Sequence, residues 1–147
     1  MDGVTYTYIL NSSDYELNEL MLSGNEKVLV TGTARLFVRG DVKLSGNASL
    51  RIEPAARLQL YMGGASANIS GGGIINLGGP RGFIYYGLPS NTSLTFKVRS
   101  VSALVYAPQA DCTITSPGHV VSDIEGAMVV KSLSLAADLN LHFDDGL

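Results

Sequence analysis

The chain has 147 residues, of which 46% are hydrophobic and 17 are glycine, a composition typical of one domain built from short strands and turns. Its formal net charge of −3 and the lack of an RNA-binding pattern among its aromatic residues argue against nucleic-acid binding. The sequence has no apolar run long enough to predict a membrane span. Its single cysteine, Cys112, excludes an internal disulfide and a cysteine-based zinc site.

The charges are segregated along the chain. Residues 1–26 carry a net charge of −5, residues 27–99 carry +7 and residues 100–147 carry −5. The basic middle is either a belt that binds a polyanion or the ordinary solvated face of strands, and we favour the second interpretation.

The N-terminal residues 1–26 are expected to form a strand and a cap. Residues 4–10 are rich in β-branched and aromatic side chains, which favours a strand. Asp14 to Met21 could form two helical turns with Leu17, Leu20 and Met21 on one side, which would cover the open end of a sheet stack. This cap, together with the repulsion between acidic ends, predicts that the domain does not form end-to-end filaments.

Residues 27–77 consist of short units in which apolar residues alternate with mostly polar ones, each unit closed by Gly, Asn or Pro. Alternation with a period of two predicts strands buried on one face. The predicted inward side chains are Val28, Val30, Leu36, Val38, Val42, Leu44, Leu50, Ile52, Leu58 and Leu60. The predicted outward side chains are Arg35, Phe37, Arg39, Lys43, Arg51, Arg57, Gln59 and Tyr61.

Equivalent apolar positions recur after 22 to 25 residues, in the pairs Val28 and Leu50, Leu36 and Leu58, Leu44 and Ile69, and Ile52 and Leu77. Three short strands per repeat predict an all-β fold, a short right-handed parallel β-helix with three faces and an N-terminal cap. Residues 1–147 would form one domain, with coils over 27–147. A β-sandwich of antiparallel strands is the alternative, because strand spacing alone fits both folds.

The glycine-rich residues 63–73 lack the lysine and the following helix of a phosphate-binding loop, and they suit tight corners instead. Residues 76–93 are the longest irregular stretch. They are expected to contain a strand around Phe83–Tyr86 and to offer a binding surface.

The alternation resumes after Ser93, where Ala103 and Ala127 are 24 residues apart and Ile114 and Leu135 are 21 apart. The segment Glu125-Gly-Ala-Met-Val-Val-Lys-Ser132 and the ending Asn140-Leu-His-Phe-Asp-Asp145, with a preceding Val105-Tyr-Ala-Pro108 turn, resemble the end of certain bacterial β-helical domains. Such domains often follow a PilX-type, prepilin-like segment in envelope proteins. The resemblance implies the fold and an extracellular or cell-surface location, and it implies no catalytic residue.

No catalytic constellation stands out, so we expect no enzyme activity, no cofactor and no metal. Asp123 and Glu125 would share a strand face, as a carboxylate pair in a glycosidase could, but acidic pairs are common by chance. His142 with Asp144 and Asp145 is the one cluster of histidine and carboxylates, and it fits an end-capping role better than a metal site. The candidate ligand-binding residues are Phe37, Tyr61, Tyr85, Tyr86, Arg39 and Arg57.

Three functions remain open. The first is a non-enzymatic structural or surface-display module of a bacterial cell-envelope or pilus-like assembly, with protein partners. The second is a carbohydrate-binding or carbohydrate-active module, with polysaccharide as the partner. The third is a self-polymerising, bactofilin-like scaffold.

Overall fold

The computed structural model describes residues 3–136 and 138–143, which form strands joined by tight corners and one turn of 3-10 helix, η1 (Pro80–Gly82). The strands are β1 (Tyr8–Leu10), β2 (Asp14–Leu17), β3 (Leu20–Leu22), β4 (Lys27–Val30), β5 (Thr33–Val38), β6 (Val42–Leu44), β7 (Ser49–Ile52), β8 (Arg57–Met62), β9 (Ser66–Ile69), β10 (Gly73–Asn76), β11 (Phe83–Gly87), β12 (Ser93–Lys97), β13 (Ser100–Thr115), β14 (Ser122–Leu135) and β15 (Leu139–Phe143).

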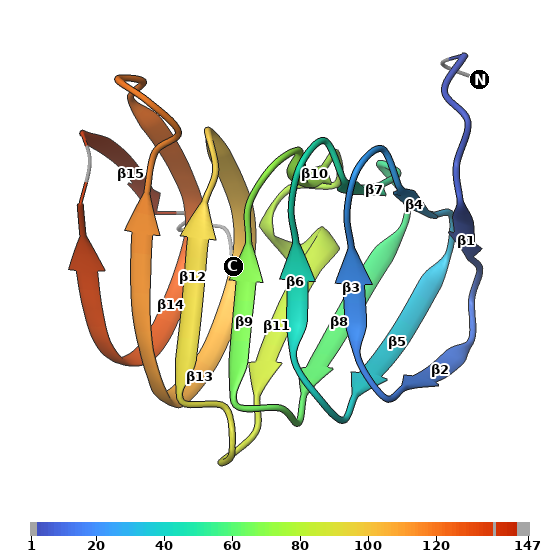
Figure 1. Ribbon diagram of the computed structural model, residues 1–147, viewed down its shortest axis with the longest axis horizontal. Coiled ribbons are helices and arrows are strands. Elements are labelled where there is room, and N and C mark those ends of the chain that lie inside the picture. Colours follow the sequence, from blue (N-terminus) through green and yellow to red (C-terminus); the bar gives the residue numbers. More distant parts are fainter. Residues whose placement is uncertain (1–2, 137, 144–147) are drawn as a thin grey trace.

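The chain winds as a right-handed solenoid of about six coils (Figure 1). Strands β3, β6, β9 and β12 ascend on the near side of Figure 1, and β5 and β8 descend on the far side, while the chain advances from right to left. All strand pairs in the part of the chain that is described are parallel, so the predicted β-helix is confirmed and the β-sandwich alternative is wrong.

The solenoid has three faces. Strands β1, β4, β7 and β10 form the top face, which is a separate sheet. The rear face contains β2, β5, β8 and β11, and the front face contains β3, β6, β9 and β12. The long strands β13 and β14 run along the rear face and then along the front face, so they join these two faces into one sheet.

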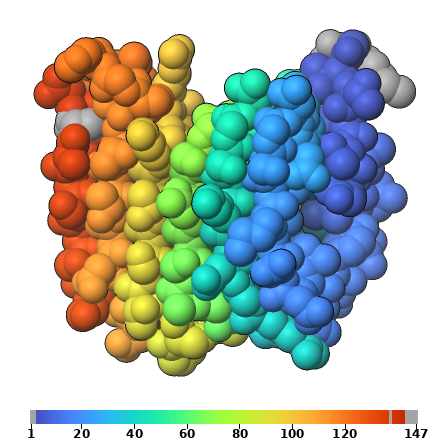
Figure 2. Space-filling view, viewed as in Figure 1, coloured from blue at the N-terminus to red at the C-terminus, as the bar shows by residue number. Residues whose placement is uncertain are grey.

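Sequence order follows the long axis of the molecule. Figure 2 shows the front face as successive bands from blue to red, one coil after another. The described residues of the two acidic segments therefore lie towards opposite ends of the molecule.

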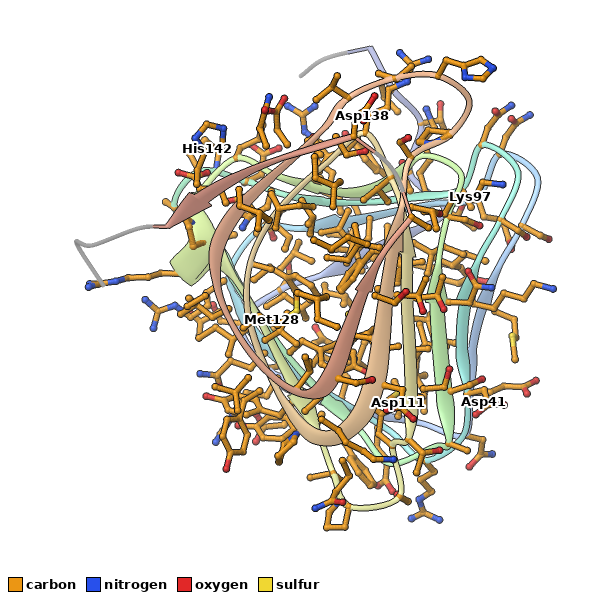
Figure 3. The ribbon with its side chains drawn as sticks, turned by 90° about the vertical axis from the view of Figure 1, so that its left-hand side faces the viewer. Asp41, Lys97, Asp111, Met128, Asp138 and His142 are labelled. Carbon is orange, nitrogen blue, oxygen red and sulfur yellow. The ribbon has the colours of Figure 1, made fainter. Side chains whose placement is uncertain are left out.

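The core is a continuous stack of apolar side chains inside the solenoid. All ten predicted inward side chains of residues 27–60 are buried, and none of the eight predicted outward ones is. Figure 3 looks along the axis and shows this filling, with Met128 pointing into the interior and Asp41, Lys97 and Asp111 on the outside. Alternation along each strand thus decides which side chains leave water, and this burial is the main favourable term in folding.

The strand register confirms three of the six predicted spacings, because the pairs are Val28 with Leu50, Leu44 with Ile69, and Ile114 with Leu135. The other three are wrong by one or two residues, since the pairs are Leu36 with Leu60, Ile52 with Asn76, and Ala103 with Gly126. The error at Leu36 is two residues because apolar residues recur every two positions. The two one-residue errors arise because Leu77 and Ala127, which the spacing predicts to face inward, are apolar residues that face outward.

One corner of the solenoid is built from glycines stacked on one another. Gly24, Gly46 and Gly71 have φ values of 58°, 66° and 68°, a left-handed conformation that glycine adopts without strain. The side-chain amide of Asn47 donates a hydrogen bond to Asn25 Oδ1 of the coil before, at 3.1 Å, and links two of these corners. Each coil therefore turns at the same place above the last one.

The predicted helical cap is wrong. Residues 14–21 form strand β2 and the start of β3, which pair with β5 and β6 of the next coil. An isolated helix of eight residues is marginal, whereas these strands gain backbone pairing and apolar contacts along their whole length. The predicted strand over residues 4–10 is confirmed only at Tyr8–Leu10.

Candidate functional site

A row of aromatic side chains runs along the rear face. Strand register places Phe37 of β5 beside Tyr61 of β8, Tyr61 beside Tyr86 of β11, and Tyr86 beside Tyr106 of β13. We call these four residues the aromatic strip. Three of them are among the predicted ligand-binding residues, so the fold brings together Phe37, Tyr61 and Tyr86 from three consecutive coils.

Two rings of the aromatic strip, those of Tyr61 and Tyr86, stack on each other. The ring centroids of Tyr61 and Tyr86 lie 4.8 Å apart, with 14° between the ring planes. This spacing matches the distance between neighbouring strands, so the stack follows directly from the coil repeat. One face of the Tyr61 ring therefore contacts one face of the Tyr86 ring on the next coil.

The aromatic strip continues into an apolar patch that the sequence analysis missed. Tyr106 is 53% exposed, and Val129, which lies beside it on β14, is 51% exposed. A shallow hollow of about 280 Å³ separates this row from the outward side chains Ile84, Leu104 and Ala127. Tyr106 alternates with buried Val105 and Ala107, and this pattern could have identified it as outward.

The remaining predicted ligand residues do not join the aromatic strip. Tyr85 points inward and is fully buried, which corrects its prediction as an outward residue. Since Tyr85 and Tyr86 are adjacent in a strand, only one of them can face solvent. Arg57 is exposed at the start of β8, and Arg39 forms an ion pair with Glu16 of the first coil.

The basic middle of the sequence is partly neutralised, by Asp14 of the coil before and by Glu53 within the same coil. The guanidinium of Arg35 donates twice to the Asp14 carboxylate, at 2.7 and 2.9 Å, and Arg51 Nε lies 3.0 Å from Glu53 Oε1. These exposed pairs are worth little stability individually.

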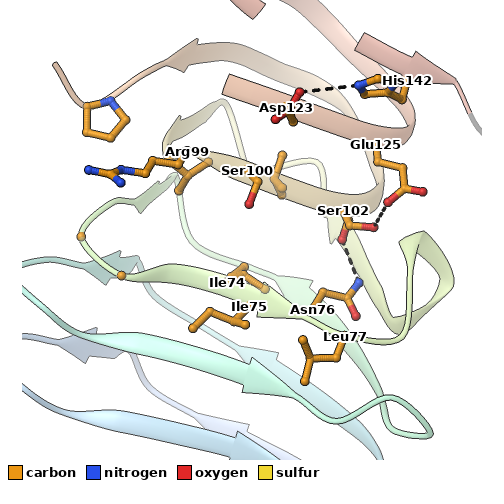
Figure 4. Close-up of a pocket in the computed structure, with 15 residues that line it drawn as sticks. Ile74, Ile75, Asn76, Leu77, Arg99, Ser100, Ser102, Asp123, Glu125 and His142 are labelled. Carbon is orange, nitrogen blue, oxygen red and sulfur yellow. Dashed lines mark hydrogen bonds and ion pairs between the residues drawn. The ribbon is translucent and has the colours of Figure 1, made fainter. Parts of the chain in front are cut away.

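A groove of about 930 Å³ crosses the top of the molecule between β10 and β15 (Figure 4). It forms where the top sheet ends at β10, because β13 has no strand pairing with β10. Its β10 side carries two exposed apolar side chains, Ile75 and Leu77, which are 39% and 44% exposed.

The opposite wall of the groove is polar. Asp123 and Glu125 of β14 both line it, which places the predicted carboxylate pair on one face. Asp123 Oδ1 accepts a hydrogen bond from Asn140 Nδ2 at 3.1 Å and lies 3.6 Å from His142 Nε2. Ser102 Oγ donates to Glu125 Oε2 at 3.0 Å.

An asparagine links the two sides of the groove. Asn76 Nδ2 donates to the Ser102 carbonyl at 2.8 Å and to the Gly79 carbonyl at 2.5 Å. His142 is paired with Asp123 of the groove. Asp144 and Asp145, its predicted neighbours, lie outside the described residues.

Among the described residues, no group of three or more His, Cys, Asp or Glu side chains could hold a metal ion, and no helix is long and apolar enough to cross a membrane. Cys112 is buried, as its alternation predicts, and burial raises the pKa of its thiol to about 11. A buried thiol of this kind behaves as a small apolar side chain.

The fold defines the class of the protein, a parallel β-solenoid with exposed apolar and polar surfaces. Residues 7–147 match the model of a domain family of unknown function, DUF7305, and the chain belongs to this family. Comparison with curated proteins and with solved structures gives no match.

Proposed function

We propose that the domain is a non-enzymatic structural or surface-display module of a bacterial cell-envelope or pilus-like assembly, and that its rear face contacts a protein partner. The observation that carries the proposal is the aromatic strip together with the neighbouring patch of Ile84, Leu104, Ala127 and Val129. This surface is exposed at Tyr106 and Val129 and half-buried elsewhere, and a contiguous apolar surface marks an interaction site. The envelope location rests on the resemblance of residues 100–147.

The geometry of the strip favours a protein partner over a sugar. A sugar packs against the face of an aromatic ring, but the faces of Tyr61 and Tyr86 are stacked on each other. Both rings are half-buried, and the exposed side chains of Tyr106 and Val129 suit a flat apolar protein surface instead.

The test is site-specific photo-crosslinking in the native bacterium. A photoreactive amino acid at Tyr106 is expected to cross-link one defined envelope protein. The matched control is Thr113, which lies on the same strand but on the front face. Recovery of the protein in the cytosolic fraction, or equal cross-linking from both positions, would contradict the proposal.

A carbohydrate-binding function is the second candidate, and the groove favours it. Its carboxylates, its asparagine and the nearby Ile75 and Leu77 could bond sugar hydroxyls and pack against a sugar ring. This function predicts that glycan binding is lost in Asp123→Asn and Glu125→Gln and kept in Tyr106→Ser. Turnover of a polysaccharide that depends on Asp123 or Glu125 would show the domain to be an enzyme.

A further inference from the structure

The N-terminal end of the solenoid is open in the described residues. Strands β1, β2 and β3 each pair on one side only, with β4, β5 and β6. Figure 1 shows β1 and β2 at the right-hand end of the molecule. Their other edges carry backbone groups without a strand partner, and such edges are templates for pairing with another chain.

The interior of the solenoid is also exposed at this end. Tyr8 and Leu17 face inward and are 53% and 37% exposed, whereas Val28 and Val38, which lie beside them in the second coil, are 4% and 0% exposed. A hollow of about 260 Å³ opens there, and it is lined by Leu10, Tyr15, Leu20, Leu22 and Leu36 among others.

The acidic charge around this hollow is largely engaged within the chain. Asp14 pairs with Arg35 and Glu16 with Arg39, and the Glu26 carboxylate accepts the Ser23 N–H at 2.8 Å. Repulsion between two N-terminal ends is therefore reduced. Glu19, which also lines the hollow, keeps a residual negative charge there.

We propose that two copies of this chain associate through their N-terminal ends, related by a two-fold axis perpendicular to the solenoid. Three strand edges surround one apolar hollow, and a second N-terminal end offers the same arrangement. Facing strands run antiparallel under this symmetry, which permits backbone hydrogen bonds. A contact of this type closes as a dimer and does not extend into a filament.

The C-terminal end is a poorer match for the N-terminal end. Strand β15 pairs only with Ser122–Gly126 of β14, and no other strand pairs with the outer edge of residues 127–135 among the described residues. The end is therefore stepped, so an N-terminal end placed on it would leave strand edges uncovered. Geometry thus favours contact between two N-terminal ends.

Sedimentation of the 147-residue chain tests the dimer. Two chains per particle are expected, and Tyr8→Lys should weaken association at least about tenfold because it buries a charge in the joint. The matched control is Val121→Lys, which changes a similarly exposed apolar residue in a later coil and should leave association unchanged. In this dimer the Glu19 carboxylates of the two copies approach each other. Salt screens their repulsion, so association should tighten as the salt concentration rises. A single chain per particle at every soluble concentration would overturn the proposal.

Disulfide trapping tests the geometry without relying on a mutant that could unfold. Copies carrying Glu19→Cys should cross-link to each other, whereas copies carrying Asp138→Cys should not, and buried Cys112 should stay unreacted. If Glu19→Cys links only to Asp138→Cys in a mixture, the assembly is head-to-tail and the proposal is wrong.

Discussion

Tyr85 and Asn91 show how polar side chains are accommodated inside the solenoid. The Tyr85 hydroxyl donates to Asn91 Oδ1 at 2.7 Å, and both side chains are fully buried. The Asn91 amide in turn faces the carbonyls of Gly64, Ala65 and Ser93, at 3.3 to 3.4 Å. Burial raises the pKa of Tyr85, so the hydroxyl stays protonated and holds the corner between β11 and β12.

Leu58 and Lys43 test the assignment of inward and outward residues. Leu58 is fully buried, so Leu58→Ala should lower the free energy of unfolding by about 2–5 kcal/mol through lost burial and a cavity. Lys43 is exposed, so Lys43→Ala should change the free energy of unfolding by less than about 0.5 kcal/mol. Urea melts measure both values, and equal effects would contradict the assignment.

Cys112 should make stability depend on alkaline pH. Burial raises the pKa of its thiol from 9.0 to about 11, so the folded state favours the protonated thiol. This stabilisation is complete below the pKa of the unfolded chain and is lost as the pH rises through that of the folded one. Between pH 9 and 11, the unfolding free energy should therefore fall more steeply in the wild type than in Cys112→Ala. Equal slopes in chemical denaturation would show that this thiol is not the cause.

At the scale of the single element, the corners are the most demanding positions. A Cβ at Gly71 would lie 2.4 Å from the Gly46 carbonyl oxygen of the coil below, a distance that requires backbone movement. Gly64 is similar, because a Cβ there would lie 2.0 Å from the Gly40 carbonyl oxygen. The close stacking of corners therefore requires glycine for reasons of space as well as conformation.

A comparison of Gly71 with Gly118 distinguishes the lack of space for a Cβ from the strain of the left-handed backbone. Their φ values are 68° and 74°, so both alanine variants carry similar conformational strain, but a Cβ at Gly118 meets no atom within 4 Å. Gly71→Ala should therefore lower the thermal midpoint clearly more than Gly118→Ala, and each is compared with the wild type by calorimetry. Equal midpoints would mean that the stacked corners separate at little cost.

On the scale of the whole molecule, each coil contacts only its neighbours. Stability in such a solenoid is close to a sum of coil stabilities and the contacts between adjacent coils. The first coil and β15 have neighbours on one side, and Leu141 on β15 is 59% exposed. The ends should therefore open more often than the middle.

Hydrogen exchange measures this gradient. Amides of β4 to β9, which pair on both sides, should exchange most slowly, and those of β1 to β3 and β15 most quickly. If the N-terminal dimer forms, protection of β1 to β3 should rise with protein concentration, while that of β15 should not. Uniform protection along the chain would contradict coil-by-coil stability.

The sequence by itself determined the fold class and the facing of most strand residues. Alternation in residues 27–60 predicted the inward side chains, because burial on one face imposes a period of two on each strand. The irregular stretch 76–93 was also predicted to contain a strand at Phe83–Tyr86, and β11 confirms it.

Only the tertiary structure decided the register, the N-terminal end and the functional surfaces. Leu36 could pair with Leu58 or Leu60 by pattern alone, and residues 14–21 suited a short helix until pairing with the next coil was possible. The aromatic strip and the groove join residues from different coils, whose separation along the chain varies with each corner. Such surfaces depend on which coil stacks on which, and no local pattern in the sequence encodes that.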